Sequence, residues 1–355
     1  MLTLLVRRLR LPAAVGIVLL VAAATDPSSP PAPAPTLVAD IMPAPAKPVS
    51  PVTLAFAGDV HFEGPLRAKL AGDRSGMFTG VAPLLRAADI AVVNLETAIT
   101  RRGTPAKKEY TFRTPPAALT ALRSAGIDAA SMANNHGLDY GRAGLTDSLA
   151  AAKAARFPII GIGRNEAEAY RPYRAVVRGQ RIAVIAATQV LDSALISSWT
   201  AGPRQPGLAS AKDVPRLVKA VAAARKNSDT VVVYLHWGTE GMQCPNAGQR
   251  SLMGSLVAAG ADIIVGSHAH VLQGAGRAGS AFVAYGLGNF AFYARSGPAI
   301  QTGVLTLTVT GRHVSKYTWA PAVIAGGVPQ PLTGVAAAQA KAGWQALRGC
   351  AGLTP

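Results

Sequence analysis

The stretch GADIIVGSHAHVLQ, Gly260–Gln273, decides how the rest of this sequence is interpreted. Its apolar run Ile263–Val265 predicts a short buried strand, and Gly266 allows the backbone to turn where that strand ends. In extended backbone the side chains of residues i and i+2 point to the same side, so His268 and His270 can face one point beyond the strand. Neutral imidazole is a common ligand of divalent transition metals, although an isolated pair of this kind is more simply explained as part of a polar loop.

Polar residues that could bind a metal follow four other apolar runs in the same way. Of the six histidines in the sequence, only His313, in a predicted hairpin turn, stands apart from this pattern. In α/β folds the loops that leave the carboxyl ends of strands form the sites, so convergence at a single site is the economical explanation. For a residue taken alone, a helix cap or a turn is an alternative. The candidates are Asp59, His61, Glu96, Asn135, His136, His236, His268 and His270.

The composition is strongly basic. The 355 residues carry a formal net charge of +17, and half of them are hydrophobic, which is enough for one large core or two modest ones. Arg101, Arg102, Lys107 and Lys108 form one loop cluster. Such a cluster is either a solvated basic surface or attracts an anionic envelope polymer or phospholipid. No nucleic-acid partner is expected, because basic and aromatic residues are not interleaved.

The N-terminal residues predict export. Three arginines within residues 7–10 precede the apolar segment Leu11–Ala24, which is too short to span a bilayer comfortably and ends in small residues. Residues 1–24 are therefore expected to be a signal peptide, with an uncleaved N-terminal anchor as the alternative. Residues 25–51, rich in Pro and Ala, are expected to form a linker. The mature protein is expected to be extracellular or associated with the cell envelope.

One folded domain is expected over residues 52–323, because apolar strand and helix patterns alternate there without a linker-like interruption. A C-terminal segment, 324–355, follows with a helix that docks through Trp344 and Leu347. The only two cysteines are Cys244 and Cys350. In an oxidising compartment they are expected to form a disulfide.

Seven motifs occur in a fixed order along this domain: GDVHF, NLET, ANNHGLDYG, GIGRN, HWGTE, GSHAHVLQ and YGLGNF. As a set they resemble the CapA family of bacterial capsule (poly-γ-glutamate) synthesis proteins, over roughly Val52 to Val323. That family is in turn similar to calcineurin-like metallophosphoesterases. The resemblance implies an α/β fold of four layers, in which two β-sheets pack face to face and are flanked by helices.

The resemblance also implies a site with two divalent metal ions. Asp59, His61 and His270 would bind one ion, Asn135, His236 and His268 the other, and Glu96 would bridge them. Mixed imidazole, amide and carboxylate ligands suit Mn, Fe or Zn. His136 would donate a proton to the leaving group. The residues expected to orient the ligating imidazoles or to line the pocket are Asn134, Asp139, Glu240, Asp262 and Asn289.

Two functions are compatible with this interpretation. The first is an exported metal-dependent hydrolase that acts on a phosphoester or on an anionic envelope polymer of the poly-γ-glutamate type, with a metal-activated water and His136 as general acid. The alternative is a non-catalytic polymer-binding, export or assembly subunit that uses the metal site to bind carboxylates. Membrane-bound capsule synthase or export subunits would be its partners. A serine hydrolase is disfavoured, because the sequence has no G-x-S-x-G motif.

Overall fold

A computed structural model of the protein describes residues 50–355. The predicted signal peptide or anchor (1–24), and the predicted linker up to residue 49, lie outside the described residues. Residues 50–355 lie within one compact unit. None of the helices in this range has the length and hydropathy that a membrane crossing requires.

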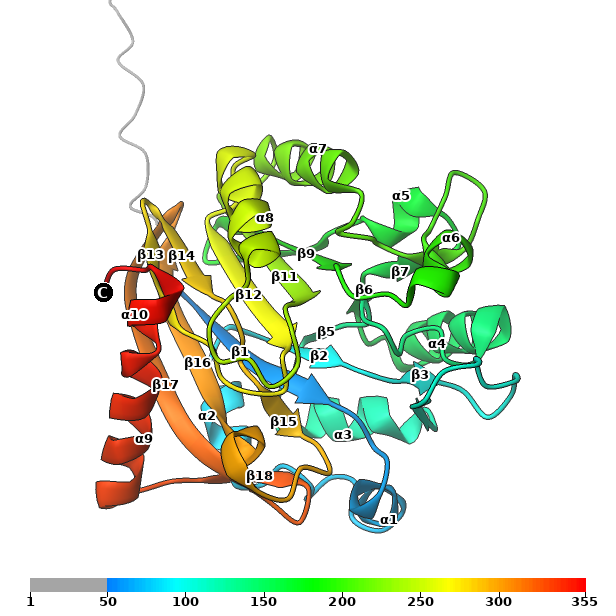
Figure 1. Cartoon of the computed structure of the whole chain (residues 1–355), viewed down its shortest axis with the longest axis horizontal. Helices are drawn as coiled ribbons and strands as arrows, with labels where there is room; N and C mark the ends of the chain where they lie inside the picture. The colour runs from blue at the N-terminus through cyan, green and yellow to red at the C-terminus, as the bar shows by residue number, and fades with distance from the viewer. Residues whose placement is uncertain (1–49) are drawn as a thin grey trace, which may run out of the picture. The chain divides into compact units, whose positions relative to one another are not determined.

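The first sheet is mixed, and its central strand is β1 (Figure 1). On one side β1 pairs in parallel with β2, and β5 and β6 continue the parallel order. On the other side β16, β17 and β18 are antiparallel, and the short β15 pairs in parallel with the end of β1. The strands of this sheet are β18 (Val328–Pro331), β17 (His313–Ala325), β16 (Gln301–Thr310), β1 (Val52–Val60), β2 (Ile90–Leu95), β5 (Ala129–Ser131), β6 (Ile159–Ile160) and β15 (Asn289–Ala291).

The second sheet has a parallel centre, in which β9, β11, β12 and β14 run in the same direction. Antiparallel strands close both of its edges. Its strands, in spatial order, are β13 (Ala275–Ala278), β14 (Ala281–Ala284), β12 (Ile263–His268), β11 (Thr230–Trp237), β9 (Gln180–Thr188) and β8 (Tyr173–Val177). Two small ribbons complete the strands: β3 (Ala98–Ile99) with β4 (Arg113–Thr114), and β7 (Ile162–Gly163) with β10 (Gly207–Leu208).

The predicted four-layer sandwich is confirmed by the three largest of the four clusters into which the buried apolar residues of the described range divide. Alternate residues of a strand point to opposite faces, and in β1 Leu54 and Phe56 face the second sheet while Ala55 and Ala57 face the helices. The cluster between the sheets joins Leu54 and Phe56 to Val232 of β11 and other residues of the second sheet. Separate clusters lie under the helices on the outer face of each sheet.

The helices therefore form the two outer layers. Helices α1 (Pro65–Ala71), α2 (Ala82–Arg86), α3 (Ala117–Ala125) and α4 (Gly141–Ala155) bury apolar residues against the first sheet, and α7 (Val214–Arg225) and α8 (Ala247–Ala258) against the second. Trp344 of α9 (Gly334–Ala346) stacks on Trp319 with ring centroids 4.7 Å apart, as a docking helix would. The remaining helical segments are α5 (Glu166–Ala169), α6 (Ile196–Trp199), α10 (Arg348–Ala351) and two 3₁₀ turns, Ser193–Leu195 and Gly297–Ile300.

The carboxyl ends of the central strands of both sheets carry the predicted polar residues. Gly58 shapes this edge, because a Cβ there would lie 1.8 Å from the carbonyl oxygen of Gly288. The missing side chain lets the segment before β15 approach β1, and Asp59 N donates a 2.9 Å hydrogen bond to the same carbonyl. The backbone at Asp59 is thereby held against the segment that precedes β15.

The role predicted for Gly266 was wrong. The backbone does not turn there, since β12 continues to His268. A Cβ at Gly266 would lie 2.0 Å from the Tyr285 carbonyl oxygen and 2.1 Å from Trp237 Nε1. Gly266 therefore provides space for the Trp237 Nε1–H to donate its 2.7 Å hydrogen bond to Tyr285.

A disulfide joins Cys244, in the loop after β11, to Cys350 in α10, with the two Cα atoms 5.6 Å apart. Arg250 of α8 donates hydrogen bonds to the carbonyl oxygens of Cys350 and Ala351. The C-terminal helix is thus held both covalently and by hydrogen bonds against the second sheet's helical layer.

We expect no reactive thiol in unfolded, unreduced protein, because both cysteines are paired. Closing a loop of this length lowers the entropy of the unfolded chain, so reduction should lower the free energy of unfolding by up to about 4–5 kcal/mol. A free-thiol assay followed by urea unfolding with and without reductant measures both effects. In the Cys244→Ser/Cys350→Ser variant the reductant should change nothing. Two reactive thiols per wild-type chain would contradict the pairing.

Candidate metal centre

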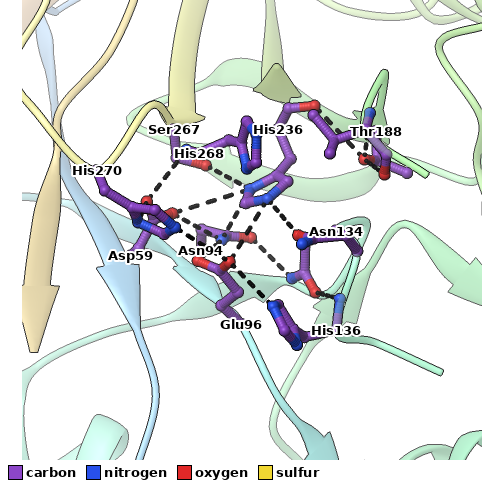
Figure 2. A network of polar contacts seen from close by, with 12 residues as sticks. Asp59, Asn94, Glu96, Asn134, His136, Thr188, His236, Ser267, His268 and His270 are labelled. Atoms are coloured by element: carbon purple, nitrogen blue, oxygen red, sulfur yellow. Dashed lines mark hydrogen bonds and ion pairs between the residues drawn. The ribbon is translucent and has the colours of Figure 1, made fainter. Parts of the chain in front are cut away.

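Four strand ends bring carboxylate and imidazole side chains to one place between the sheets (Figure 2). Asp59 comes from β1, Glu96 from the residue after β2, His236 from β11 and His268 from the end of β12; His270 follows two residues later. The first four are fully or almost fully buried, and the His270 side chain is one-fifth exposed. A ligand could therefore reach this otherwise enclosed centre from the side of His270.

These side chains form two overlapping groups that could each hold a metal ion. Asp59, Glu96 and His270 make one group, and Glu96, His236 and His268 make the other, with the candidate ligand atoms of each group within 4.8 Å of one another. Glu96 belongs to both groups, which is the position that a bridging carboxylate would take. The exposed Glu240 forms a third combination with His268 and His270.

Asn94 is central to this arrangement, although it is not among the site residues predicted from the sequence. Its Nδ2 donates to Asp59 Oδ1 at 2.8 Å and lies 3.2 Å from His236 Nδ1. Asn134 Nδ2 in turn donates to Asn94 Oδ1 at 3.0 Å, and its Oδ1 accepts from the backbone N–H of His136. The period of two along β2 was the available signal, because it places Asn94 on the same side as Glu96.

Several buried polar atoms at the centre have no hydrogen-bond partner among the described residues. They are Glu96 Oε1, His268 Nδ1 and His61 Nε2. Leaving a buried polar atom unpaired costs free energy, and nearly all such atoms in folded proteins are paired. Carboxylate oxygens and imidazole nitrogens coordinate divalent transition metals, and Glu96 and His268 belong to the same candidate group. The residues present therefore fit a metal ion.

The electrostatics also favour a cation. Burial raises the pKa of Glu96 well above its ordinary value, and the charge of Asp59 raises it further. Burial lowers the pKa of His236 well below its usual range and that of His268 to about 3, so both rings are neutral and have a free lone pair. His270 differs: burial would lower its pKa, but Glu96 and Asp59 raise it to about 9. His270 thus supplies positive charge to the carboxylates in the absence of a metal.

His136 lies beside these groups and is held by Asp139. Its Nδ1 is 2.6 Å from Asp139 Oδ2, and its Nε2 lies 3.9 Å from Glu96 Oε1. Phe112 stacks on the ring at 4.0 Å and donates its backbone N–H to the same carboxylate oxygen. Asp139 thus orients the predicted proton donor instead of a ligating imidazole. Burial lowers the pKa of His136, and Asp139 opposes that effect.

Lys108 completes this cluster. Its Nζ lies 3.0 Å from Asp139 Oδ1 and 3.4 Å from His136 Nδ1, and it donates to the Asn135 carbonyl oxygen. Only 9% of its side chain is exposed. The sequence placed Lys108 in a basic loop, and no local pattern identified it as a residue that reaches the centre.

The other predicted residues are distributed unequally. Asn135 Oδ1 lies 2.8 Å from His236 Nε2, next to the second group, and Asn289 Oδ1 lies 2.9 Å from His270 Nδ1. The His61 ring packs among Phe112, Phe292 and Tyr293 and is in neither group. Its Nδ1 accepts from the backbone N–H of Glu63 at 3.0 Å.

One prediction about an orienting residue was wrong. Asp262 lies at the opposite end of β12, where it pairs with Arg225 and Arg312 and accepts from the backbone N–H of Val231. Glu240 is exposed in the loop after β11, and its carboxylate forms a group with His268 and His270 in which the candidate ligand atoms lie within 4.8 Å of one another. Its role beside these imidazoles stays a prediction.

The extended backbone predicted for the two neighbouring histidines is also wrong. His268 has φ 89° and His270 has φ 56°, both in a region that residues other than glycine rarely adopt. The turn, and not a strand's alternation, brings their ring centroids to 5.7 Å. His268 N donates to Asp59 Oδ2 at 3.0 Å and Asn289 Nδ2 to the His270 carbonyl oxygen at 3.1 Å, which holds the strained backbone in place.

Comparison with known proteins gives a consistent set of relatives. The family model described as "Bacterial capsule synthesis protein PGA_cap" matches residues 53–294. "PGA biosynthesis protein CapA" of Bacillus subtilis is 31% identical over 246 residues, which cover 68% of this chain and 63% of that protein. "Capsule biosynthesis protein CapA" of Bacillus anthracis is 33% identical over 223 residues, 61% of this chain and 53% of that protein. The chain therefore spans between half and two-thirds of the length of these relatives.

Among solved structures, a "novel phosphatase" of Mycoplasma pneumoniae aligns with 78% of this chain and 94% of its own. The TM-score is 0.47 and the sequence identity 14%. A similarity at this level says nothing about activity.

The left-handed backbone conformation at His270 should affect how substitutions there change the stability of the metal-free protein. Since glycine adopts a positive φ without strain and alanine does not, we expect His270→Gly to be more stable than His270→Ala by about 1 kcal/mol. At His313, in β17, the order should reverse, because glycine weakens a strand. Chemical denaturation of the four variants in the presence of a chelator gives both differences. Equal stability of the two His270 variants would contradict the turn.

Proposed function

Since this chain belongs to the bacterial capsule synthesis family PGA_cap, we propose that it acts on an anionic capsule polymer of the poly-γ-glutamate type, or on a phosphoester, through a dinuclear metal centre. The observation that carries the proposal is Glu96, a fully buried carboxylate shared by two candidate ligand groups, with one oxygen unpaired. The names of the Bacillus relatives, which refer to PGA and capsule biosynthesis, support the choice of polymer.

Asp59, Glu96 and His270 would hold one ion, and Glu96, His236 and His268 the other. Asn135 Oδ1, next to His236, is placed to join the second set, and ligation by His61 stays a prediction. The donor set of imidazole, amide and carboxylate favours Mn, Fe or Zn over Ca or Mg. When bound, two such ions lower the pKa of a shared water and stabilise the attacking and leaving oxygens of a displacement.

The protein's own contribution to the chemistry is the proton donor. Asp139 occupies Nδ1 of His136, so the proton exchanged with a substrate would be on Nε2, the nitrogen that faces Glu96. Asp139 also stabilises the protonated ring, and the stacked Phe112 restricts its rotation. An imidazole held in this way, beside the ligands without being one of them, suits a general acid that protonates the leaving group, which is an oxygen in a phosphoester and the amide nitrogen in γ-linked polyglutamate.

We also propose that the protein is exported and works at the cell envelope. The basic N-terminal residues followed by a short apolar segment support this proposal. Membrane-bound synthase or export subunits are the partners that polymer synthesis at this location would require.

Metal analysis tests the centre. Protein reconstituted with Mn, Fe or Zn should bind up to about two ions per chain, and Asp59→Ala or His268→Ala should each remove about one, because each belongs to only one of the two main groups. Glu96→Ala should remove both. His313→Ala, an exposed histidine far along the chain from the centre, is the matched control and should bind as the wild type does. A wild type that binds no metal would contradict the centre.

Turnover by the metal-loaded protein separates the two functions. We expect hydrolysis of a phosphoester or of γ-linked polyglutamate, and His136→Ala should lower its rate about 10²–10⁴-fold while metal content is retained, because only the general acid is lost. The assay compares rates and metal content of the same preparations, with His313→Ala as control. Metal-dependent polymer binding without any turnover would instead establish the non-catalytic alternative.

A further inference from the structure

A cavity of about 540 Å³ is lined by Phe62, by residues of α1 and by residues between Thr100 and Ala117. Four arginines line it, and no acidic side chain does. Its accessible apolar surface includes Ala71 and Pro115. The arginines come from two separate regions of the chain: Arg67, Arg74, Arg101 and Arg113. A cavity of this size is within the range of small-molecule binding sites.

Two of these guanidinium groups are not neutralised. Within residues 50–355, Arg74 and Arg101 have no hydrogen bond or ion pair with a carboxylate, whereas the adjacent Arg102 pairs with Asp147. Arg67 pairs with Glu63, and the Arg113 guanidinium lies 4.9 Å from the centroid of the Tyr140 ring. Positive charge that the protein leaves unpaired around a concave surface attracts anions.

The cavity and the metal centre share backbone. His61 and Phe112 contact each other at the centre, while the next residue of each, Phe62 and Arg113, lines the cavity. Glu63 connects the two as well, because its backbone N–H donates to His61 Nδ1 and its Oε1 accepts from the backbone N–H of Arg113. An anionic chain bound in the cavity would therefore be held next to the centre.

We propose that this cavity binds the carboxylates of an extended anionic polymer. The choice of a carboxylate as the ligand group rests on the proposed function. The cavity and its charged residues are features of the structure and do not rest on that function. Guanidinium groups bind carboxylates through paired, charge-assisted hydrogen bonds, and arginines at several positions around one cavity suit a ligand with repeated charges. The apolar surface of Ala71 and Pro115 accommodates the methylene groups between the carboxylates of such a polymer.

The test uses fluorescently labelled γ-linked oligoglutamate and the full chain, in metal-loaded form and again with a chelator. Arg74→Ala/Arg101→Ala should weaken binding about 10-fold in both states, since two unpaired charges are lost and no internal ion pair is broken. The matched control is Arg204→Ala/Lys316→Ala, which removes the same charge from exposed positions outside the cavity. The control should change the affinity less than about 2-fold, because distant surface charges are screened by salt.

The outcomes distinguish this inference from the proposed function. Equal weakening by the cavity variant and the control would overturn the cavity and leave the metal centre unaffected. Binding by the wild type that is lost with the chelator, and is unchanged in Arg74→Ala/Arg101→Ala, would place the polymer at the metal centre and also overturn the cavity. No binding by the wild type would overturn the cavity and the choice of polymer in the proposed function, while the metal centre and the phosphoester are tested by metal content and turnover. Weakening that is specific to the cavity variant in both metal states establishes the inference.

Discussion

The burial of Glu96 between the two sheets is the constraint on which this structure depends. A carboxylate removed from water is costly unless charges or hydrogen bonds compensate for it, and Glu96 has an unpaired oxygen with Asp59 close by. Two carboxylates face three imidazoles in one enclosed space. A divalent cation would compensate the negative charge of these carboxylates far better than the protein itself does. Without the metal, the positive charge of His270 is the nearest substitute, which is why its pKa is raised.

The rigidity of the sandwich makes such an arrangement possible. Tyr234, in the layer between the sheets, donates a 2.6 Å hydrogen bond to the Ala57 carbonyl oxygen and so links β11 to β1. The bond is made two residues before Asp59 and two residues before His236. The positions of ligands on different sheets are thereby fixed relative to each other, as a metal site requires. His268 and His270 have left-handed backbone conformations, which cost free energy locally. The surrounding structure holds them in these conformations.

The fold was predictable to the extent that it depends on periodicity. Apolar runs located the central strands, and the polar residues after them located the edge where the site forms, because the carboxyl ends of parallel strands coincide. The periodicity of apolar residues does not predict the backbone conformation after a strand, so the turn at His268 and His270 was not predicted. It also does not predict contacts made across a long loop. Lys108 reaches His136 through such a loop, and Asp262 belongs to the opposite end of its strand, which its distance of six residues from His268 already indicated.

The positions of the basic residues in the structure show that they do not all have the same role. Many arginines, such as Arg102, Arg181 and Arg225, form ion pairs with aspartates and are part of an ordinary solvated or structural surface. The segment from Thr100 to Thr114 is different, since it supplies Arg101 and Arg113 to the cavity and Lys108 to the cluster around His136. One loop thus supplies Arg101, which has no carboxylate partner among residues 50–355, to the cavity and Lys108, which pairs with Asp139, to the proton donor. A net charge of +17 alone could not distinguish this concentration from a uniform surface. A polyanion attracted by the net positive charge of the molecule would meet Arg74 and Arg101 in the cavity, where neither is paired with a carboxylate of the described residues.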